Sequence, residues 1–162
     1  MNLEESVLAE FDREMSRCRR ILASIPEDKM TWKAHDDMHD ICWNANHIVD
    51  LIGWTPLILS EAEFDMAPVD GPAYETSSES NPSKLLELFD QNVTAARSAL
   101  GAVSSSTLQE PWALKQAGQT LFTINKGECV RTWVMNHMIH HRAILSVCLR
   151  LAGVAVTPAY DE

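Results

Sequence analysis

Apolar residues recur with a helical period in the N-terminal segment of the chain. They lie at alternating spacings of three and four residues: Leu8, Phe11, Met15, Cys18, Leu22 and Ile25. This spacing places them on one face of a helix. Pro26 ends that helix, because its ring clashes with the preceding turn. The polar stretch 26–39 is then predicted to be a loop.

A second helix is predicted from about residue 41 to residue 59. At about 100° per residue, one set of its side chains falls within roughly 40° of a single line. This set contains Trp43, His47, Leu51, Trp54 and Ile58. A second apolar strip beside it contains Ile41, Ala45, Ile48 and Ile52. The helix should therefore be buried over a wide arc, with His47 inside that arc.

A loop, a third helix and an extended connection follow. Residues 61–80 are rich in Pro, Gly, Ser and acidic residues, which is typical of a loop. Asn81 and Pro82 open the third helix, since proline is well placed in a first turn. Its predicted buried face consists of Leu85, Phe89, Val93, Ala96, Leu100 and Val103. Residues 104–127 contain a proline, two glycines and a short alternating run, which favours an extended connection with room for one short hairpin.

A fourth helix is predicted from about residue 128 to residue 152, where Gly153 ends it. The chain thus contains four long helices and two long connections, without an internal repeat. This pattern predicts an all-α fold, a four-helix bundle whose helices do not simply run up and down in turn. With 162 residues, the chain is long enough to bury the core of one domain, residues 1–162.

Composition and charge restrict the partners of this domain. Apolar residues make up 46% of the chain and charged residues 22%, as in ordinary globular proteins. The formal net charge of -10 disfavours binding to nucleic acid or to an anionic membrane surface. No apolar run is long enough to cross a bilayer, and the acidic N-terminus argues against a signal peptide. The four cysteines form no CxxC pair, so we expect reduced thiols in a cytoplasmic protein.

The three histidines of the fourth helix can be sorted by direction. The apolar stripe of this helix contains Val130, Val134, Ile144, Leu145, Cys148 and Ala152, all within about 60° of one line. His137 and His141 lie near the centre of the stripe, whereas His140 lies roughly 80° away, at its edge. Two histidines therefore project into the predicted core from consecutive turns.

These two histidines and His47 together predict a metal site. Side chains at i and i+4 are about 5–6 Å apart at Cβ, which suits two imidazoles that share an ion. A lone core histidine is more often a hydrogen-bonded packing residue, and that remains the alternative for each histidine taken alone. Burying three imidazoles is costly unless something satisfies their nitrogens, and a metal does so. We therefore predict one divalent metal ion on His47, His137 and His141.

Two stretches of the chain resemble the DinB-like family of the DinB/YfiT superfamily. They are WKAHDDMHDICWNANHIVDLIGWTPLIL, around His47, and VMNHMIHHRAILSVCLRLAGVAV, around His137 and His141. The resemblance extends over nearly the whole chain. It implies a four-helix bundle with a three-histidine site for nickel, zinc or iron, and a homodimer. It assigns the same three ligands as the helical geometry does.

Five other residues in these two stretches could also contribute to a site. His35 and His39 are predicted to be solvated loop residues, although the resemblance places His35 near the site, where it would line a pocket. His140 points in the wrong direction to share the ion and is assigned to the surroundings of the site or to an interface. Cys148 lies too far along the helix axis to bind the same ion and is predicted to be a core residue. Asp50 is either a hydrogen-bond partner of a ligand or a solvated charge.

Three protein ligands leave a divalent ion with an open coordination position, as in catalytic metal sites. The first hypothesis is therefore a metal-dependent enzyme. The resemblance implies a thiol S-transferase or a hydrolase that acts on a small molecule, with a low-molecular-weight thiol as a candidate partner. The second hypothesis is a non-catalytic metal-binding or stress-response protein, which the lack of an obvious general base favours. The third, DNA binding or repair, is disfavoured by the net charge of -10.

Overall fold

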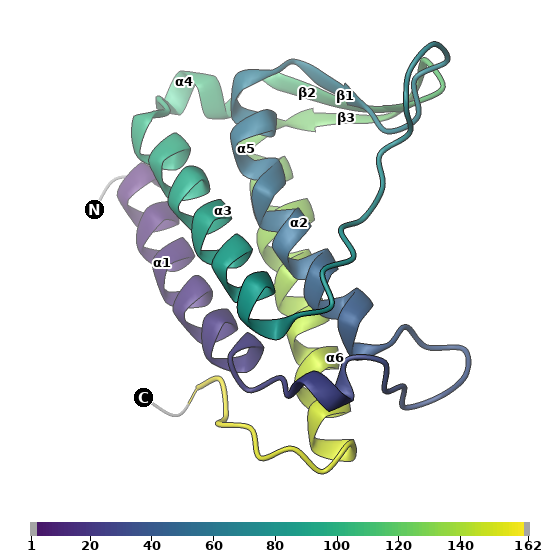
Figure 1. Cartoon of the computed structure of the whole chain (residues 1–162). Helices are drawn as coiled ribbons and strands as arrows, with labels where there is room; N and C mark the ends of the chain where they lie inside the picture. The colour runs from purple at the N-terminus through teal and green to yellow at the C-terminus, as the bar shows by residue number, and fades with distance from the viewer. Residues whose placement is uncertain (1–2, 161–162) are drawn as a thin grey trace.

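Four long helices lie side by side and form the body of the molecule (Figure 1). The computed structural model describes residues 3–160. The long helices are α1 (Leu3–Leu22), α2 (Ile41–Ser60), α3 (Pro82–Ala102) and α6 (His137–Leu151). Helices α1 and α2 each contact α3 and α6, so every long helix has two neighbours and the apolar faces meet in one core. The four predicted helices are therefore present in the structure.

The helices begin where the sequence supplies a cap. At the start of α2, the Asp40 carboxylate accepts a hydrogen bond from the backbone N–H of Trp43 at 2.7 Å. At the start of α3, the Asn81 side chain accepts from the backbone N–H groups of Ser83 and Lys84. Such caps satisfy donors that the first turn leaves without partners. Most residues of the predicted stripes are buried, among them Phe11, Met15, Cys18 and Leu22 of α1 and Ile41, Ala45, Ile48 and Ile52 of α2, whereas Leu8, Trp43, Trp54, Val93 and Val103 are half-buried.

A three-stranded sheet covers one end of the helices, at the top of Figure 1. Its strands are β1 (Glu63–Asp65), β2 (Pro111–Gln116) and β3 (Gln119–Asn125), in the order β1-β2-β3. The antiparallel pair β2 and β3 is the short hairpin predicted within residues 104–127. Its turn consists of Ala117 and Gly118. Their φ angles, 51° and 75°, are both positive, as the two central residues of a type I′ hairpin turn require.

Strand β1 lies within residues 61–80, where the sequence predicts only loop, so the prediction of an all-α fold is wrong at this point. β1 pairs with β2 in parallel. At its two ends, the N–H of Ala113 donates to the carbonyl of Ala62 (3.0 Å) and the N–H of Met66 to that of Lys115 (2.9 Å). Three residues are too short to show an alternating pattern; β1 is ordered by hydrogen bonds to the edge of β2. The fold is mostly helical with a small mixed sheet.

The predicted fourth helix is one continuous helical segment with an irregular middle. It consists of α5 (Lys126–Cys129), the π-helix η2 (Val130–Asn136) and α6. A π-helix has wider turns than an α-helix, so the regular rotation assumed for residues 128–152 does not hold through η2. His137 and His141 both lie in α6, and their predicted i, i+4 relation is therefore preserved.

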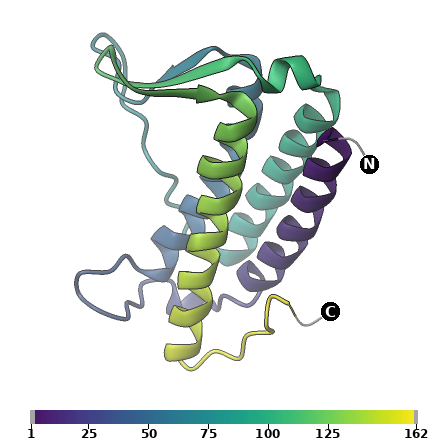
Figure 2. The same ribbon diagram turned by 180° about the vertical axis from the view of Figure 1, so that it is seen from behind.

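The chain beyond α6 runs back across the lower end of the bundle toward α1, as Figure 2 shows. The carbonyl of Ala159 accepts a hydrogen bond from Arg20 of α1 at 2.9 Å, and that of Val156 accepts one from Arg150 of α6 at 3.2 Å. The tail therefore ties α1 and α6 together. Two short helices complete the described chain, η1 (Glu27–Lys29) and α4 (Ser105–Leu108).

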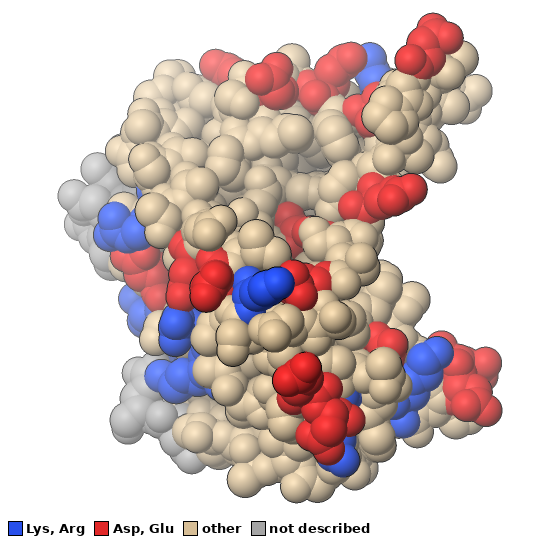
Figure 3. Space-filling view, viewed as in Figure 1, with Lys and Arg blue, Asp and Glu red and all other residues tan. Residues whose placement is uncertain are grey.

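Surface charge and hydropathy add two observations. On the face drawn in Figure 3, Lys and Arg side chains are scattered among Asp and Glu and form no continuous basic surface. Between residues 3 and 160, no helix combines the length and the apolar character that crossing a membrane requires. All four cysteines are free thiols, and Cys148 is buried in the core as the sequence predicts.

Candidate metal centre

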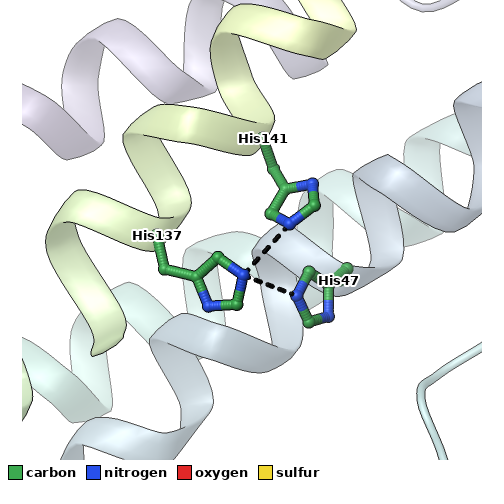
Figure 4. Close-up of side chains that lie close together, drawn as sticks. All are labelled: His47, His137 and His141. Atoms are coloured by element: carbon green, nitrogen blue, oxygen red, sulfur yellow. Dashed lines mark hydrogen bonds between the residues drawn. The ribbon is translucent and has the colours of Figure 1, made fainter. Parts of the chain in front are cut away.

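The three histidines that the sequence singles out come together between α2 and α6 (Figure 4). His47 projects from α2, and His137 and His141 project from successive turns of α6. The Nε2 atom of His137 lies 3.1 Å from Nε2 of His141 and 3.4 Å from Nε2 of His47. One nitrogen from each ring lies within 4.8 Å of the other two. The side chains thus converge on one point.

Asn44 holds the ring of His141 in a fixed orientation. Its side chain is buried, with 2% of the residue exposed, and its Oδ1 lies 3.1 Å from Nδ1 of His141. The Asn44 Nδ2 donates to the backbone carbonyls of Asp40 (2.8 Å) and His39 (3.3 Å), which leaves Oδ1 as the atom that faces His141. An acceptor beside Nδ1 places the proton of the neutral ring there, so Nε2 presents its lone pair to the other two histidines.

The spacings of His137 from the other two histidines fit a single metal ion. Two nitrogens that each lie about 2.0–2.1 Å from one ion are at most about 4.2 Å apart, and both distances from His137 are shorter than that. Hydrogen bonds alone do not satisfy the cluster, because a proton on Nε2 of His137 can be donated to only one of the two neighbouring rings. A cation between the rings would instead accept a lone pair from each of them.

Burial keeps the three imidazoles neutral. It lowers the pKa of His47 to about 4, and the neighbouring His137 acts in the same direction. Burial also lowers the pKa of His141 to about 3, with further contributions from His47 and His137. The pKa of His137 is lowered first by burial and then by His140. At neutral pH the rings therefore carry no second proton, and each retains one nitrogen lone pair.

Trp43 covers one side of the cluster. Its indole stacks on the ring of His47, with centroids 4.6 Å apart and planes inclined by 21°. It also meets the ring of His141 edge-on, at a centroid distance of 5.6 Å. His39 stacks on Trp43 in turn, at 3.6 Å. His39, predicted as a solvated loop residue, is exposed but belongs to the aromatic surroundings of the site.

The other predicted candidates lie outside the cluster of three nitrogens. His35 is exposed, and its Nδ1 accepts a hydrogen bond from the N–H of Asp37 within the same loop. The loop histidine that contacts Trp43 is His39 instead. The exposed ring of His140 adjoins that of His141 edge-on at 5.0 Å. This is the edge position that the helical sorting predicts for His140.

Asp50 is occupied by the loop after β1. Its two carboxylate oxygens accept hydrogen bonds from the backbone N–H (2.7 Å) and the hydroxyl (2.6 Å) of Ser77. Of the two interpretations that the sequence leaves open, neither describes it fully: Asp50 holds this loop against α2. The partner of a candidate ligand is Asn44, which sequence analysis missed. The available signal was an amide within the buried arc of α2, since a buried amide needs hydrogen-bond partners.

Asn44→Ala is expected to weaken metal binding by roughly 10–100-fold, the usual cost of removing a hydrogen-bond partner of a metal-bound histidine. His141 would lose both its orientation and its preferred tautomer. The measurement is the dissociation constant for zinc, obtained in competition with a chelator. Asn44→Asp keeps an oxygen acceptor but loses the two hydrogen bonds that Nδ2 donates to the carbonyls of Asp40 and His39, so it should recover part of the affinity. An equal loss in both variants would contradict this role of Asn44.

A shallow hollow opens beside His137. It has a volume of about 280 Å³ and is lined by Thr132, Trp133, Asn136 and His137. The first three of these residues belong to the π-helix η2, a kind of helix that occurs frequently at functional sites. A more enclosed apolar cavity of about 290 Å³ is lined by none of the three histidines. The hollow, unlike that cavity, gives a small molecule a place next to a candidate ligand.

Comparison with known proteins identifies the fold and the family. The sequence model of the DinB family matches residues 1–162. The crystal structure of a DinB-like protein from Bacillus subtilis is similar, with a TM-score of 0.71 and 15% identity over 94% of this chain and 96% of that chain. A DinB-like protein from Bacillus cereus ATCC 10987 has a TM-score of 0.72 and 20% identity over 96% and 97% of the two chains. None of the curated proteins matches this chain.

Proposed function

This chain belongs to the DinB family, and we propose that it binds one divalent metal ion on His47, His137 and His141 and acts as a metal-dependent enzyme. The observation that carries the proposal is the convergence of three neutral imidazoles beside a hollow that reaches one of them. Nickel, zinc and iron all accept imidazole ligands, so the donor set is compatible with each of these ions.

The residues around the histidines have distinct tasks in this proposal. A divalent ion with an open coordination position supplies Lewis acidity, which favours the deprotonated form of a thiol or a water molecule. Asn44 keeps the Nε2 lone pair of His141 directed at the ion. Trp43 excludes solvent from the side of His47. The hollow beside His137 receives the substrate.

We propose that the reaction is not hydrolysis but joins the sulfur of a low-molecular-weight thiol to an electrophilic carbon of a small molecule. The C–S bond forms as the bond from that carbon to its leaving group breaks, and the thiol proton is released with the leaving group. A free thiol has a pKa of about 8.5, against about 15.7 for water, so a thiol needs far less assistance to lose its proton. Both oxygens of Asp50, the nearest carboxylate along α2, are bound to Ser77. Because Asp50 is held by Ser77, it is not free to act as a general base. This favours a nucleophile that loses its proton without a strong base.

The open coordination position leads to a spectroscopic prediction. With cobalt in place of the native ion, addition of a small thiol is expected to produce a sulfur-to-cobalt charge-transfer band, because three protein ligands leave room for an external one. The measurement is an absorption titration of the cobalt-loaded protein with ethanethiol. The His47→Ala variant, which lacks one candidate ligand, is the control for cobalt bound elsewhere.

A cobalt spectrum that responds neither to thiols nor to azide would contradict the enzyme proposal. It would show a closed coordination shell and favour the alternative, a non-catalytic metal-binding or stress-response protein. The hollow beside His137 supports the open site, since binding an ion for storage alone does not require space for a second molecule next to a ligand.

A further inference from the structure

The hollow beside His137 is lined by uncharged groups. A molecule bound there would lie against Thr132, Trp133, Asn136 and His137. The neighbouring cation, Arg131, forms an ion pair with Glu10, so its charge is already balanced by a carboxylate of the chain. Carboxylates and phosphates are usually bound by arginine or lysine. This lining therefore favours an uncharged group over an anionic one.

Trp133 presents a large aromatic surface in this hollow. It is 41% exposed, although it is one of the largest apolar side chains. Its ring stacks on Phe122 of β3, with centroids 4.9 Å apart and planes inclined by 11°. Phe122 contacts the ring of Trp112 at 6.4 Å, and Trp112 is buried. This row of rings holds the indole in place before a ligand binds, so little side-chain entropy is lost on binding.

The position of Trp133 relative to the metal centre is also defined. Its ring meets that of His137 edge-on, with centroids 6.3 Å apart and planes at 82°. Trp43 covers His47 and His141 from another side. A small molecule in the hollow therefore lies beside both Trp133 and His137. Because these two rings are neighbours, a ligand ring held on Trp133 needs only a short link to a group at His137.

We propose that Trp133 and Phe122 form an aromatic platform that recognises the substrate of the metal centre by a flat, uncharged ring. A short link joins this ring to the group that meets the ion. This inference rests on the proposed function and adds the chemical class of the substrate: a small aromatic compound of the benzyl type. Asn136 and Thr132 offer an amide and a hydroxyl to polar substituents on such a ring.

The test compares two thiols of similar size on the cobalt-loaded protein. Benzyl mercaptan carries a flat ring, and cyclohexylmethanethiol carries one that is not flat. Their dissociation constants are read from the charge-transfer band. Trp133→Leu is expected to raise the dissociation constant of benzyl mercaptan by about three- to tenfold, the strength of one aromatic contact. The dissociation constant of cyclohexylmethanethiol should change much less.

Two further variants serve as controls. Trp133→Phe keeps a ring and should retain most of the preference for benzyl mercaptan. Leu121→Ala changes an exposed side chain on the same strand as Phe122 and should leave both dissociation constants unchanged. If the ratio of the two constants is the same in wild type and in Trp133→Leu, with the charge-transfer band intact, the aromatic platform is overturned.

A second measurement does not depend on the ion. In the metal-free protein, benzyl alcohol should shift the indole N–H resonance of Trp133 more than cyclohexylmethanol does; the resonance is assigned by its loss in Trp133→Phe. This shift without a charge-transfer band would support the platform and contradict the open metal centre. A resonance that responds to protein concentration, but not to benzyl alcohol, would show that a second copy of the chain covers Trp133 and would refute the inference.

Discussion

His141→Ala is expected to abolish stoichiometric binding of a divalent ion, while His140→Ala leaves it nearly intact. His141 contributes one of the three converging nitrogens, and His47 and His137 already contribute the other two. Loss of a direct ligand should cost more than the roughly 10–100-fold that a hydrogen-bond partner of a ligand contributes. Elemental analysis of protein purified without added metal should give about one ion per wild-type chain and far less for the variant.

His140→Ala is the matched control for this result. The two histidines are adjacent in α6 and their rings touch, but His140 is exposed and lies outside the group of converging nitrogens. His47→Ala and His137→Ala should behave like His141→Ala. Equal losses at His140 and His141 would mean that the site is not the one that Figure 4 shows.

Glu14→Ala is expected to lower the free energy of unfolding by about 3–5 kcal/mol, because it leaves a buried guanidinium without its carboxylate. That guanidinium belongs to Arg142 of α6, which is 3% exposed and donates from Nη1 to Oε2 of Glu14 at 2.7 Å. The Tyr160 hydroxyl, 3.4 Å from Nη2 of Arg142, is too distant to replace the carboxylate. In thermal unfolding, the loss corresponds to a fall of the melting temperature by roughly 6–20 °C.

The ionised state of Glu14 and an exposed ion pair provide the checks on this expectation. Burial by itself raises the pKa of Glu14, but the hydrogen bonds and charges of Arg142 and Arg17 outweigh it and hold the pKa below its usual value. Arg97→Ala removes a pair with Asp12 of similar length, 2.9 Å, in which both partners are exposed, and should change the free energy of unfolding far less, because solvent screens such a pair.

The double variant Glu14→Leu with Arg142→Met separates charge from packing. It removes both charges and fills the space with apolar groups, so it should be more stable than Glu14→Ala. If Glu14→Ala were as mild as Arg97→Ala, the pair would have to be hydrated rather than buried.

Homodimer formation, the cytoplasmic location and the identity of the metal stay predictions, as does the small-molecule substrate.

The sequence by itself determined the long helices and the three converging histidines, because both depend on local periodicity. Residues four apart in a regular helix point in nearly the same direction whatever surrounds the helix. His137 and His141 meet this condition, since both lie in α6. His47 lies in the predicted apolar arc of α2, and two apolar faces have to meet in the core. The hairpin of β2 and β3 was also predictable, from its alternation and its turn residues.

Only the tertiary structure decided which polar groups act as partners. Asn44 and His141 are separated by 97 residues, and Glu14 and Arg142 by 128. Arg142 lies off the apolar stripe of its helix, so its burial is caused by α1 rather than by its own neighbours. Strand β1 is likewise ordered by β2, far along the chain. Such pairs leave no periodic pattern in either segment, because each segment alone is equally compatible with hydration by solvent.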